Sequence, residues 1–255
     1  MEKTTFRANI SSGFRAPNTS ELLSNGVHEG TNRFEIGNPN LKSENATQID
    51  LTFDYQNEHL SFSINTFYNA IQNFIFLSPV DTIIDNVPVF EYLQSRAKLF
   101  GGEIGIHYHP HSIHWLHFES NLSTVFGEDK DKDPLPLIPA TRLNSTLKAE
   151  FSQKGKLKIK DAFIQHIYKF RQNRTSLFET PTEDYHLLNF GLNFEISTKN
   201  QPIEMTVGIK NLLNTKYIDH LSRFKPMGIP NQGMNFYIGL KVKFEKKIDM
   251  NGANN

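Results

Sequence analysis

Apolar and polar residues alternate over most of the chain. Ile49, Leu51, Phe53 and Tyr55 are apolar, whereas the residues between them are polar. This period of two is typical of a β-strand with one apolar and one polar face. The pattern recurs and predicts about ten strands, of which the segment Leu157–Tyr168 is the least regular.

The connections between the expected strands alternate between long and short. The long ones are Arg15–Asn45, Ser78–Ser95, Gly127–Ala140, Arg171–Asp184 and Thr215–Gly233, and the short ones are Gln56–His59, Pro110–Ile113, Gln153–Lys156 and Thr198–Gln201. In an antiparallel up-and-down meander, this order places all tight turns at one end and all loops at the other, as in outer-membrane barrels. A soluble β-sandwich with Greek-key crossings is not expected to keep that order.

Composition adds a second reason to consider a membrane barrel. The chain holds 21 Phe, 8 Tyr and 1 Trp although its mean hydropathy is −0.46, which excludes a bundle of transmembrane helices. Many aromatic residues fall at expected strand ends, where a membrane barrel places its interfacial aromatic residues. The alternative interpretation is that these rings fill the core of a soluble sandwich. Basic and acidic residues number 27 each, so no nucleic-acid partner is indicated.

Catalytic chemistry finds little support in the residues. The absence of Cys removes thiolate metal sites and Cys nucleophiles, and no G-x-S-x-G, H-E-x-x-H or P-loop motif occurs. We therefore expect no enzyme and no cofactor. Five histidines near one short connection are interpreted as ordinary polar lining of a lumen rather than as a metal site; they are His107, His109, His111, His114 and His117.

Three segments resemble TonB-dependent outer-membrane receptors. Gly13–Pro17 with Phe34–Glu44 resembles a strand exit, loop and strand re-entry of that family, and Lys210–Tyr217 resembles its penultimate-strand motif. Asn235–Phe244 is similar to its closing strand with a terminal aromatic residue. The resemblance covers nearly the whole chain and matches the C-terminal part of the family.

The resemblance implies a fold and a division of the chain. Such receptors are 22-stranded barrels that hold an N-terminal plug domain. Residues 1–244 are then expected to be the C-terminal part of the barrel, with the plug and TonB box absent, and residues 245–255 a polar tail. The opening residues show no secretory signal, so either export is absent or the true N-terminus lies upstream.

The same resemblance implies function and partners. It points to a receptor in the cell outer membrane for a metal chelate (a siderophore) or a metal ion, surrounded by lipid and energised by the TonB complex through the plug. The alternatives are a passive porin-like or adhesive barrel and a soluble carbohydrate-binding β-sandwich. Inward polar residues expected to line the lumen are Glu103, Glu119, Lys148, Glu150 and Lys241.

Candidate binding residues lie in the expected extracellular loops. The segments around His28 and Ile218–Phe224 resemble the branch of the family that includes zinc-uptake receptors. They imply a substrate mouth in which His28 and His220 bind metal and an arginine contacts an anionic siderophore. The full set of predicted binding residues is His28, Glu29, Arg33, Asp219, His220 and Arg223; ordinary solvated loop residues are the alternative interpretation.

Overall fold

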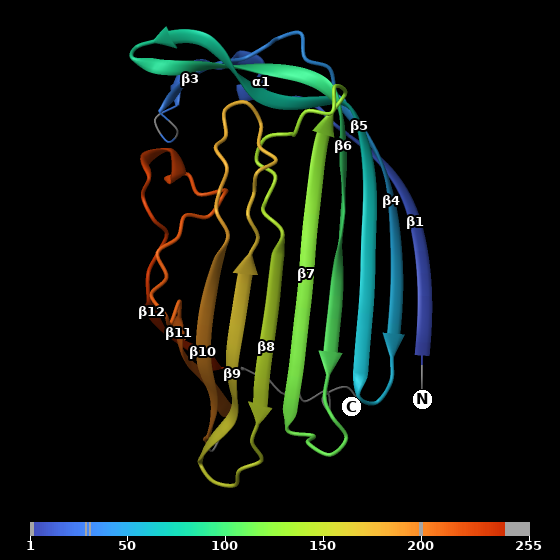
Figure 1. Ribbon diagram of the computed structural model, residues 1–255, viewed down its shortest axis with the longest axis vertical. Helices are drawn as coiled ribbons and strands as arrows, with labels where there is room; N and C mark the ends of the chain where they lie inside the picture. Colours follow the sequence, from blue (N-terminus) through green and yellow to red (C-terminus); the bar gives the residue numbers. More distant parts are fainter. Residues whose placement is uncertain (1–2, 29, 31, 199–200, 243–255) are drawn as a thin grey trace, which may run out of the picture.

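The computed structural model describes residues 3–28, 30, 32–198 and 201–242, and nearly all of its regular structure is β-strand (Figure 1). The predicted site residue Glu29, the terminal aromatic Phe244 and the predicted tail 245–255 lie outside the described residues. Neither of the two short helices of the described part is long and apolar enough to cross a membrane. The elements are β1 (Lys3–Arg15), α1 (Thr19–Leu23), β2 (Asn25–His28), β3 (Arg33–Ile36), β4 (Glu44–Gln56), β5 (Leu60–Ile84), β6 (Val87–Tyr108), β7 (Leu116–Asp129), β8 (Arg142–Glu150), β9 (Leu157–Lys169), β10 (Tyr185–Ser197), β11 (Pro202–Lys210), the 3₁₀ helix η1 (Lys225–Met227) and β12 (Asn235–Val242).

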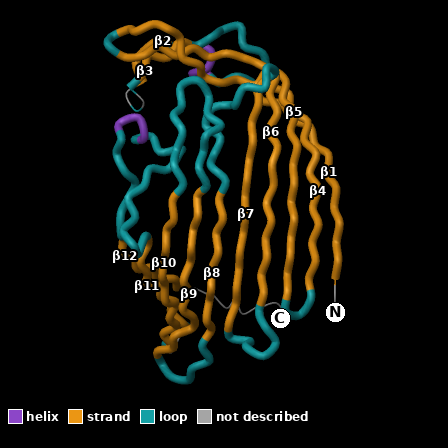
Figure 2. The backbone as a smooth tube through the Cα atoms, viewed as in Figure 1, coloured by secondary structure: helices purple, strands orange, loops and turns teal. Residues whose placement is uncertain are grey.

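Ten of these strands form the predicted antiparallel meander. Each strand pairs with its neighbour in the order β1-β4-β5-β6-β7-β8-β9-β10-β11-β12. The tight turns gather at one end and the long connections at the other (Figure 2). The additional strands β2 and β3 form a short hairpin within the first long connection. The predicted fold class is therefore confirmed, and the predicted order of long and short connections holds except at Ser78–Ser95.

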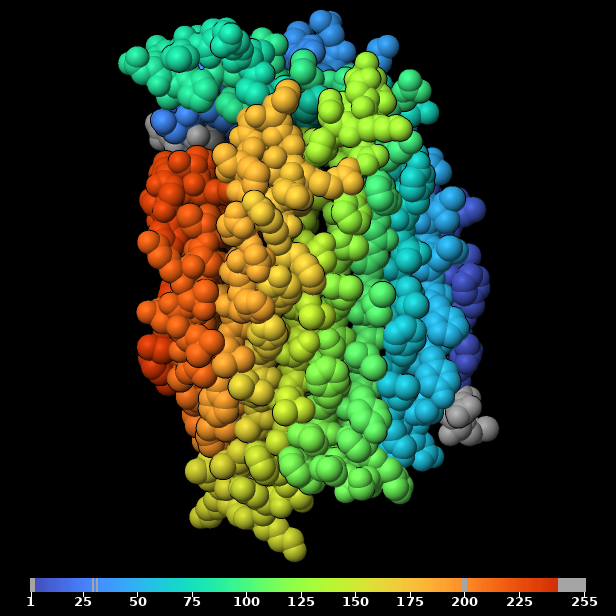
Figure 3. All heavy atoms as spheres, viewed as in Figure 1, coloured from blue at the N-terminus to red at the C-terminus, as the bar shows by residue number. Residues whose placement is uncertain are grey.

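The meander is a single layer whose apolar face is exposed. Phe6 keeps 68% of its surface accessible and Ile238 keeps 73%. The few buried apolar residues of the described part include a small cluster made by Ile71, Ala97 and Leu135. In Figure 3 the strands form one continuous wall, with the joined ends of β5 and β6 (teal) lying across its upper end. A soluble sandwich would bury this apolar face between two layers, so that alternative does not describe the fold.

Aromatic side chains on the exposed face form two rows. Near the tight turns, Tyr55 pairs with Phe62 in register, and Tyr108 pairs with Phe118. Toward the loops, Phe100 pairs with Tyr68 on one side and with Phe126 on the other, and its ring centroid lies 5.5 Å from that of Phe126. Two aromatic rows that flank an aliphatic band are the arrangement expected at the two interfaces of an outer membrane.

The irregular phase of Leu157–Tyr168 has a local cause. The register between β9 and β10 shifts between Asn193 and Phe194, because Asn193 faces Asp161 whereas Phe194 faces Ile159. The extra residue in β9 is Lys160, and a bulge of this kind reverses the face on which successive side chains lie. Asp161 therefore faces the polar side, where its Oδ1 accepts a hydrogen bond of 2.7 Å from Asn193.

One expected loop is instead part of the sheet. Ser78–Ser95 was predicted as a long connection, but β5 and β6 continue through it as a hairpin that turns at Asp85 and Asn86, both with positive φ. Alternation is lost there because part of the hairpin is covered: Val89 is fully buried and Phe90 nearly so. A strand covered on both sides does not show a polar face.

Candidate substrate mouth and lumen

The long connections form a group at one end of the wall, which we call the mouth loops. They comprise residues 16–43, the hairpin end 79–95, and residues 130–141, 170–184 and 211–234. In Figure 2 they are drawn largely as loops at the end opposite the tight turns. Their contacts determine which predicted binding residues remain accessible.

The first mouth loop begins at a charged clamp built from the motif that resembles the receptor family. Nε of Arg15 donates to Glu44 (2.8 Å), and its Nη1 donates to Glu21 (2.9 Å). Asn18 and Glu21 form a capping box at the start of α1, which satisfies backbone N–H groups that would otherwise lack partners. The clamp fixes the exit from β1 and the entry into β4.

The β2–β3 hairpin is attached to the end of β6. β3 pairs in parallel with β6, with Glu35 opposite Phe90. Glu35 is only 5% exposed. Its carboxylate accepts a hydrogen bond of 2.8 Å from Nε of Arg33 and one of 3.0 Å from the hydroxyl of Tyr92. The Arg33 guanidinium also lies 5.1 Å from the ring centroid of Phe90. Arg33 is therefore held mainly by its own hairpin.

His28 is an exposed residue of this hairpin. It faces Arg33 in the β2–β3 register and lies at the end of β2. Its role in ligand binding stays a prediction.

The last mouth loop holds Asp219 in a fixed position. Its Oδ2 accepts a hydrogen bond of 2.7 Å from the hydroxyl of Tyr185, and its Oδ1 accepts one of 3.0 Å from the backbone of Leu221. Burial alone would raise the pKa of the Asp219 carboxyl, but these hydrogen bonds and the charge of Lys169 outweigh it and lower that pKa. Asp219 is thus an ionised carboxylate that positions the loop.

His220 connects the last mouth loop to residues 170–184. Its side chain is only 2% exposed. Nδ1 lies 2.8 Å from Thr182 Oγ1 and accepts from Lys225 Nζ at 3.1 Å. The proton is therefore on Nε2, which points to Glu179 Oε1 at 3.7 Å. Burial and the Lys225 charge lower the pKa of His220, so the ring is neutral in this arrangement.

The predicted binding residues thus fall into two sets. His28 and Arg33 belong to the β2–β3 hairpin, and Asp219, His220 and Arg223 belong to the last mouth loop. His28 and Arg223 are exposed, whereas His220 is buried and bonded within the loops. The assignment of these residues to substrate binding stays a prediction, and His28 and Arg223 are the members best placed to meet a ligand.

Further contacts join the remaining mouth loops. Gln172 Nε2 donates to the carbonyl oxygen of Ile138 at 3.1 Å, and the backbone N–H of Leu137 donates to Glu179 at 2.9 Å. Phe178 packs edge-on against Phe90, with ring centroids 5.4 Å apart. Residues 170–184 therefore contact the hairpin end, residues 130–141 and the last mouth loop.

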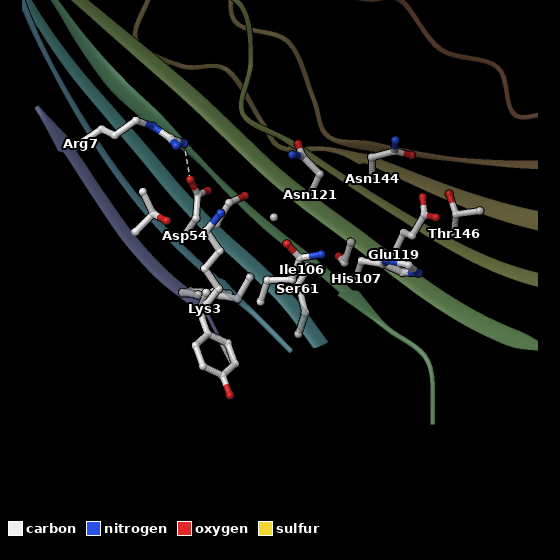
Figure 4. Close-up of a pocket in the computed structure, with 17 residues that line it drawn as sticks. Lys3, Arg7, Asp54, Ser61, Ile106, His107, Glu119, Asn121, Asn144 and Thr146 are labelled. Carbon is white, nitrogen blue, oxygen red and sulfur yellow. Dashed lines mark hydrogen bonds and ion pairs between the residues drawn. The ribbon is translucent and has the colours of Figure 1, made fainter. Parts of the chain in front are cut away.

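The opposite face of the wall is polar, as expected for a lumen. Cross-strand pairs on it include an ion pair of Arg7 with Asp54 and a hydrogen bond of 2.9 Å from Thr52 to Asn65. Toward the tight turns this face lines a hollow of about 530 Å³, to which Arg7, Asp54, His107 and Glu119 contribute (Figure 4). The five predicted lumen residues all share this face by strand register; they are Glu103, Glu119, Lys148, Glu150 and Lys241.

Sequence reasoning missed the residues that organise the mouth. Glu35, Glu179 and Thr182 carry contacts between segments far apart in the chain, and no local pattern marks them. The capping box is different, because Asn18 followed three residues later by Glu21 is a recognisable helix start in the sequence itself.

A single-layer meander with an exposed apolar belt, two aromatic rows and a polar inner face is the wall of an outer-membrane β-barrel. The family comparison agrees. The chain belongs to the TonB dependent receptor-like, beta-barrel family, whose model matches residues 2–212.

Several solved structures share this fold. The copper transporter OprC aligns with 93% of this chain at 21% identity and a TM-score of 0.72. The siderophore receptor PirA from Acinetobacter baumannii and the FrpB iron transporter (F3-3 variant) from Neisseria meningitidis each align with 93% of it at 17% identity and a TM-score of 0.64. The chain covers 37%, 38% and 36% of those three proteins, respectively.

Proposed function

We propose that this chain is part of the wall and mouth of an outer-membrane receptor that takes up a metal chelate, such as a siderophore, or a metal ion. In the full-length protein, uptake is energised by the TonB complex through a plug domain. The family match supports this general role, and the similar structures are of proteins described as a copper transporter, a siderophore receptor and an iron transporter.

The observation that carries the proposal is the combination of a lipid-type outer face with a mouth whose loops are joined to one another. Phe90 and Phe178 connect the hairpin end to residues 170–184, and Thr182 and His220 connect those residues to the last mouth loop. A passive pore needs an open entrance, whereas a receptor needs a defined surface that holds a ligand before transport. The joined loops favour the receptor over the porin-like alternative.

An uptake assay tests this proposal. The full-length receptor is expressed in a strain that lacks its other metal receptors, with and without a functional TonB. Uptake of radiolabelled ferric siderophores, zinc and copper is then measured. We expect saturable uptake of one of these substrates that disappears without TonB. Uptake that is linear in concentration and independent of TonB would support the passive barrel instead.

Variants of the exposed predicted residues locate the ligand. Each of His28→Ala and Arg223→Ala removes a side chain able to bind a metal or a carboxylate, and the loss of one charge-assisted hydrogen bond corresponds to about tenfold or more in affinity. Lys216→Ala is the matched control, because Lys216 is also exposed and charged in the last mouth loop. Equal uptake by all three variants and the unmodified receptor would remove these two residues from the binding site.

A further inference from the structure

Six of the ten histidines gather at the tight-turn end of the wall, opposite the mouth. His59 comes from the turn between β4 and β5, and the other five come from the end of β6, the turn after it and the start of β7. The backbone N–H of His109 donates to the carbonyl oxygen of His59 at 2.9 Å, so the two turns are joined. The group, which we call the histidine cluster, consists of His59, His107, His109, His111, His114 and His117.

The strand register directs part of this cluster to the lumen. His107 pairs with Glu119 across β6 and β7, and both share the polar face with His117 two residues before Glu119. Figure 4 shows His107 and Glu119 on neighbouring strands at the hollow described above. His109 follows on the same side, just past the end of β6, so that its ring lies 5.6 Å from that of His107 and 5.4 Å from that of His117, centroid to centroid.

Three of these rings have nitrogens at distances suited to one metal ion. His107, His109 and His117 each offer a nitrogen, and these nitrogens all lie within 4.8 Å of one another. Nε2 of His107 and Nδ1 of His117 are 3.0 Å apart. In a tetrahedral site with metal–nitrogen bonds of about 2.0–2.1 Å, ligand nitrogens lie about 3.3–3.4 Å apart. Small rotations of the half-buried rings would reach that spacing.

Unsatisfied nitrogens provide a second, independent observation. Within the histidine cluster, Nδ1 of His59 and Nδ1 of His109, a member of the three-ring group, are inaccessible to solvent and make no hydrogen bond. Buried polar atoms are nearly always bonded, so a concentration of unbonded imidazole nitrogens indicates a missing partner. A cation that accepts imidazole lone pairs is such a partner.

The acidic surroundings of His117 fit the same interpretation. Its Nε2 faces Glu150 Oε2 at 3.6 Å. Metal-binding histidines usually donate their second N–H to a carboxylate, which fixes the ring and makes the other nitrogen a better ligand. With Nε2 directed to Glu150, Nδ1 of His117 is free to turn toward a metal beside His107. The positive charge of nearby Lys148 is balanced by Glu150, at 2.8 Å.

We propose that His107, His109 and His117 form a binding site for a divalent transition-metal ion of the type that imidazole prefers, such as Zn²⁺ or Cu²⁺, at the tight-turn end of the lumen. His59, His111 and His114 surround the site on its outer side: His59 Nε2 and His111 Nδ1 are 3.1 Å apart, and the His111 and His114 rings are 5.1 Å apart. This site is separate from the mouth, and it stands whether or not the mouth residues bind substrate.

Metal titration of the full-length receptor, purified in detergent without a polyhistidine tag, tests the site. After treatment with a chelator, Zn²⁺ binding is measured by calorimetry, and Cu²⁺ binding by electron paramagnetic resonance. We expect the variants H107Q and H117Q to lose one equivalent of bound Zn²⁺, and Mg²⁺ not to compete. Cu²⁺ should bind more tightly than Zn²⁺ and show coupling to several nitrogens in the unmodified protein.

The chain offers a matched control in a second histidine pair. His166 Nε2 and His186 Nδ1 are 2.9 Å apart and their rings are stacked, but no third histidine, Asp or Glu among the described residues completes a group around them. The variant H166Q/H186Q should therefore keep the equivalent of Zn²⁺ that H107Q loses. Equal Zn²⁺ binding by H107Q, H117Q and the unmodified protein would overturn the proposal, as would an equal loss in the control variant. If the first variants fail to fold, a Cu²⁺ spectrum of the unmodified protein with coupling to no more than one nitrogen would overturn it as well.

Discussion

Ile104 provides a sharp test of which face of the wall meets lipid. It lies in β6 on the exposed apolar face, where it pairs with Ile64 and Leu122. Tyr108 and Phe100, which belong to the two aromatic rows, are each four residues away on the same face. Four residues of a strand tilted by about 40° cover about 10 Å along the membrane normal, and the apolar band is about 25 Å tall. Ile104 is therefore expected near the centre of the bilayer.

The substitution Ile104→Arg places a charge at that depth. An arginine at the bilayer midplane on the lipid face of a barrel costs about 2–4 kcal/mol of folding free energy. This cost corresponds to about a 30- to 900-fold loss in the folding equilibrium constant. The matched control is Ser123→Arg, because Ser123 is adjacent to Leu122 but faces the lumen, opposite Glu103. There the new guanidinium lies on the water-facing side between the carboxylate of Glu103 and the guanidinium of Arg142, so attraction and repulsion largely offset and we expect a change within about 1 kcal/mol.

Urea titration of the full-length receptor in phospholipid vesicles measures the difference. The folded fraction is read from its altered migration on unheated gels. Ile104→Arg should shift the midpoint to lower urea or prevent assembly, whereas Ser123→Arg should assemble as the unmodified protein does. If both variants behave alike, or if Ser123→Arg is the more damaging, the assignment of faces is wrong.

Three further changes have defined outcomes. Glu35→Gln weakens the buried contact to Arg33 and the hydrogen bond from Tyr92, so we expect about 1–3 kcal/mol of local destabilisation. This should appear as faster hydrogen exchange over residues 33–36 and 88–92. Unchanged exchange would contradict the role of Glu35 in joining β3 to β6. The pKa of His220 is lowered in the folded loops. Its contribution to the stability of these loops is therefore complete above about pH 6.5 and is lost as pH falls below that value. Hydrogen exchange in residues 180–184, corrected for the intrinsic rate, should rise on acidification, and His220→Gln should remove that dependence. Gly101→Ala would place a Cβ 2.2 Å from the backbone oxygen of Thr124, whereas nothing lies within 4 Å of a Cβ at Gly13. We expect Gly101→Ala to lower the free energy of unfolding by about 1–3 kcal/mol, seen as a lower urea midpoint, and Gly13→Ala to change it little. Equal midpoints would refute the close approach.

The strands were predictable because one face of each is apolar and the other polar, which leaves a period of two in the sequence. The failures have physical causes that act against this signal. Lys160 reverses the faces of β9 at a bulge, and the end of the β5–β6 hairpin is covered by other segments, so that Val89 and Phe90 follow one another without alternation. The bulge left only a break in the alternation that did not reveal its cause, and the covering segments lie outside the strands that they cover.

The candidate sites were predictable only in part, for a related reason. Loop histidines could be recognised by residue type, but their accessibility depends on distant partners: Thr182, Lys225 and Glu179 together bury His220. The membership of the histidine cluster also depends on a distant segment. Sequence proximity identified five members, but His59, 48 positions before His107, joins them only through the pairing of β5 with β6.

The contacts among the mouth loops have a consequence for how ligand binding is measured. The β2–β3 hairpin is paired to β6, Phe90 contacts Phe178, and Thr182 contacts His220, so these segments form one connected unit. Substitutions within such a network change the free energy of binding in a coupled manner, whereas substitutions at sites that are far apart and unconnected change it additively. Affinity changes from single substitutions in different mouth loops will therefore not sum, and a ligand that contacts one loop will alter the protection of the others from hydrogen exchange.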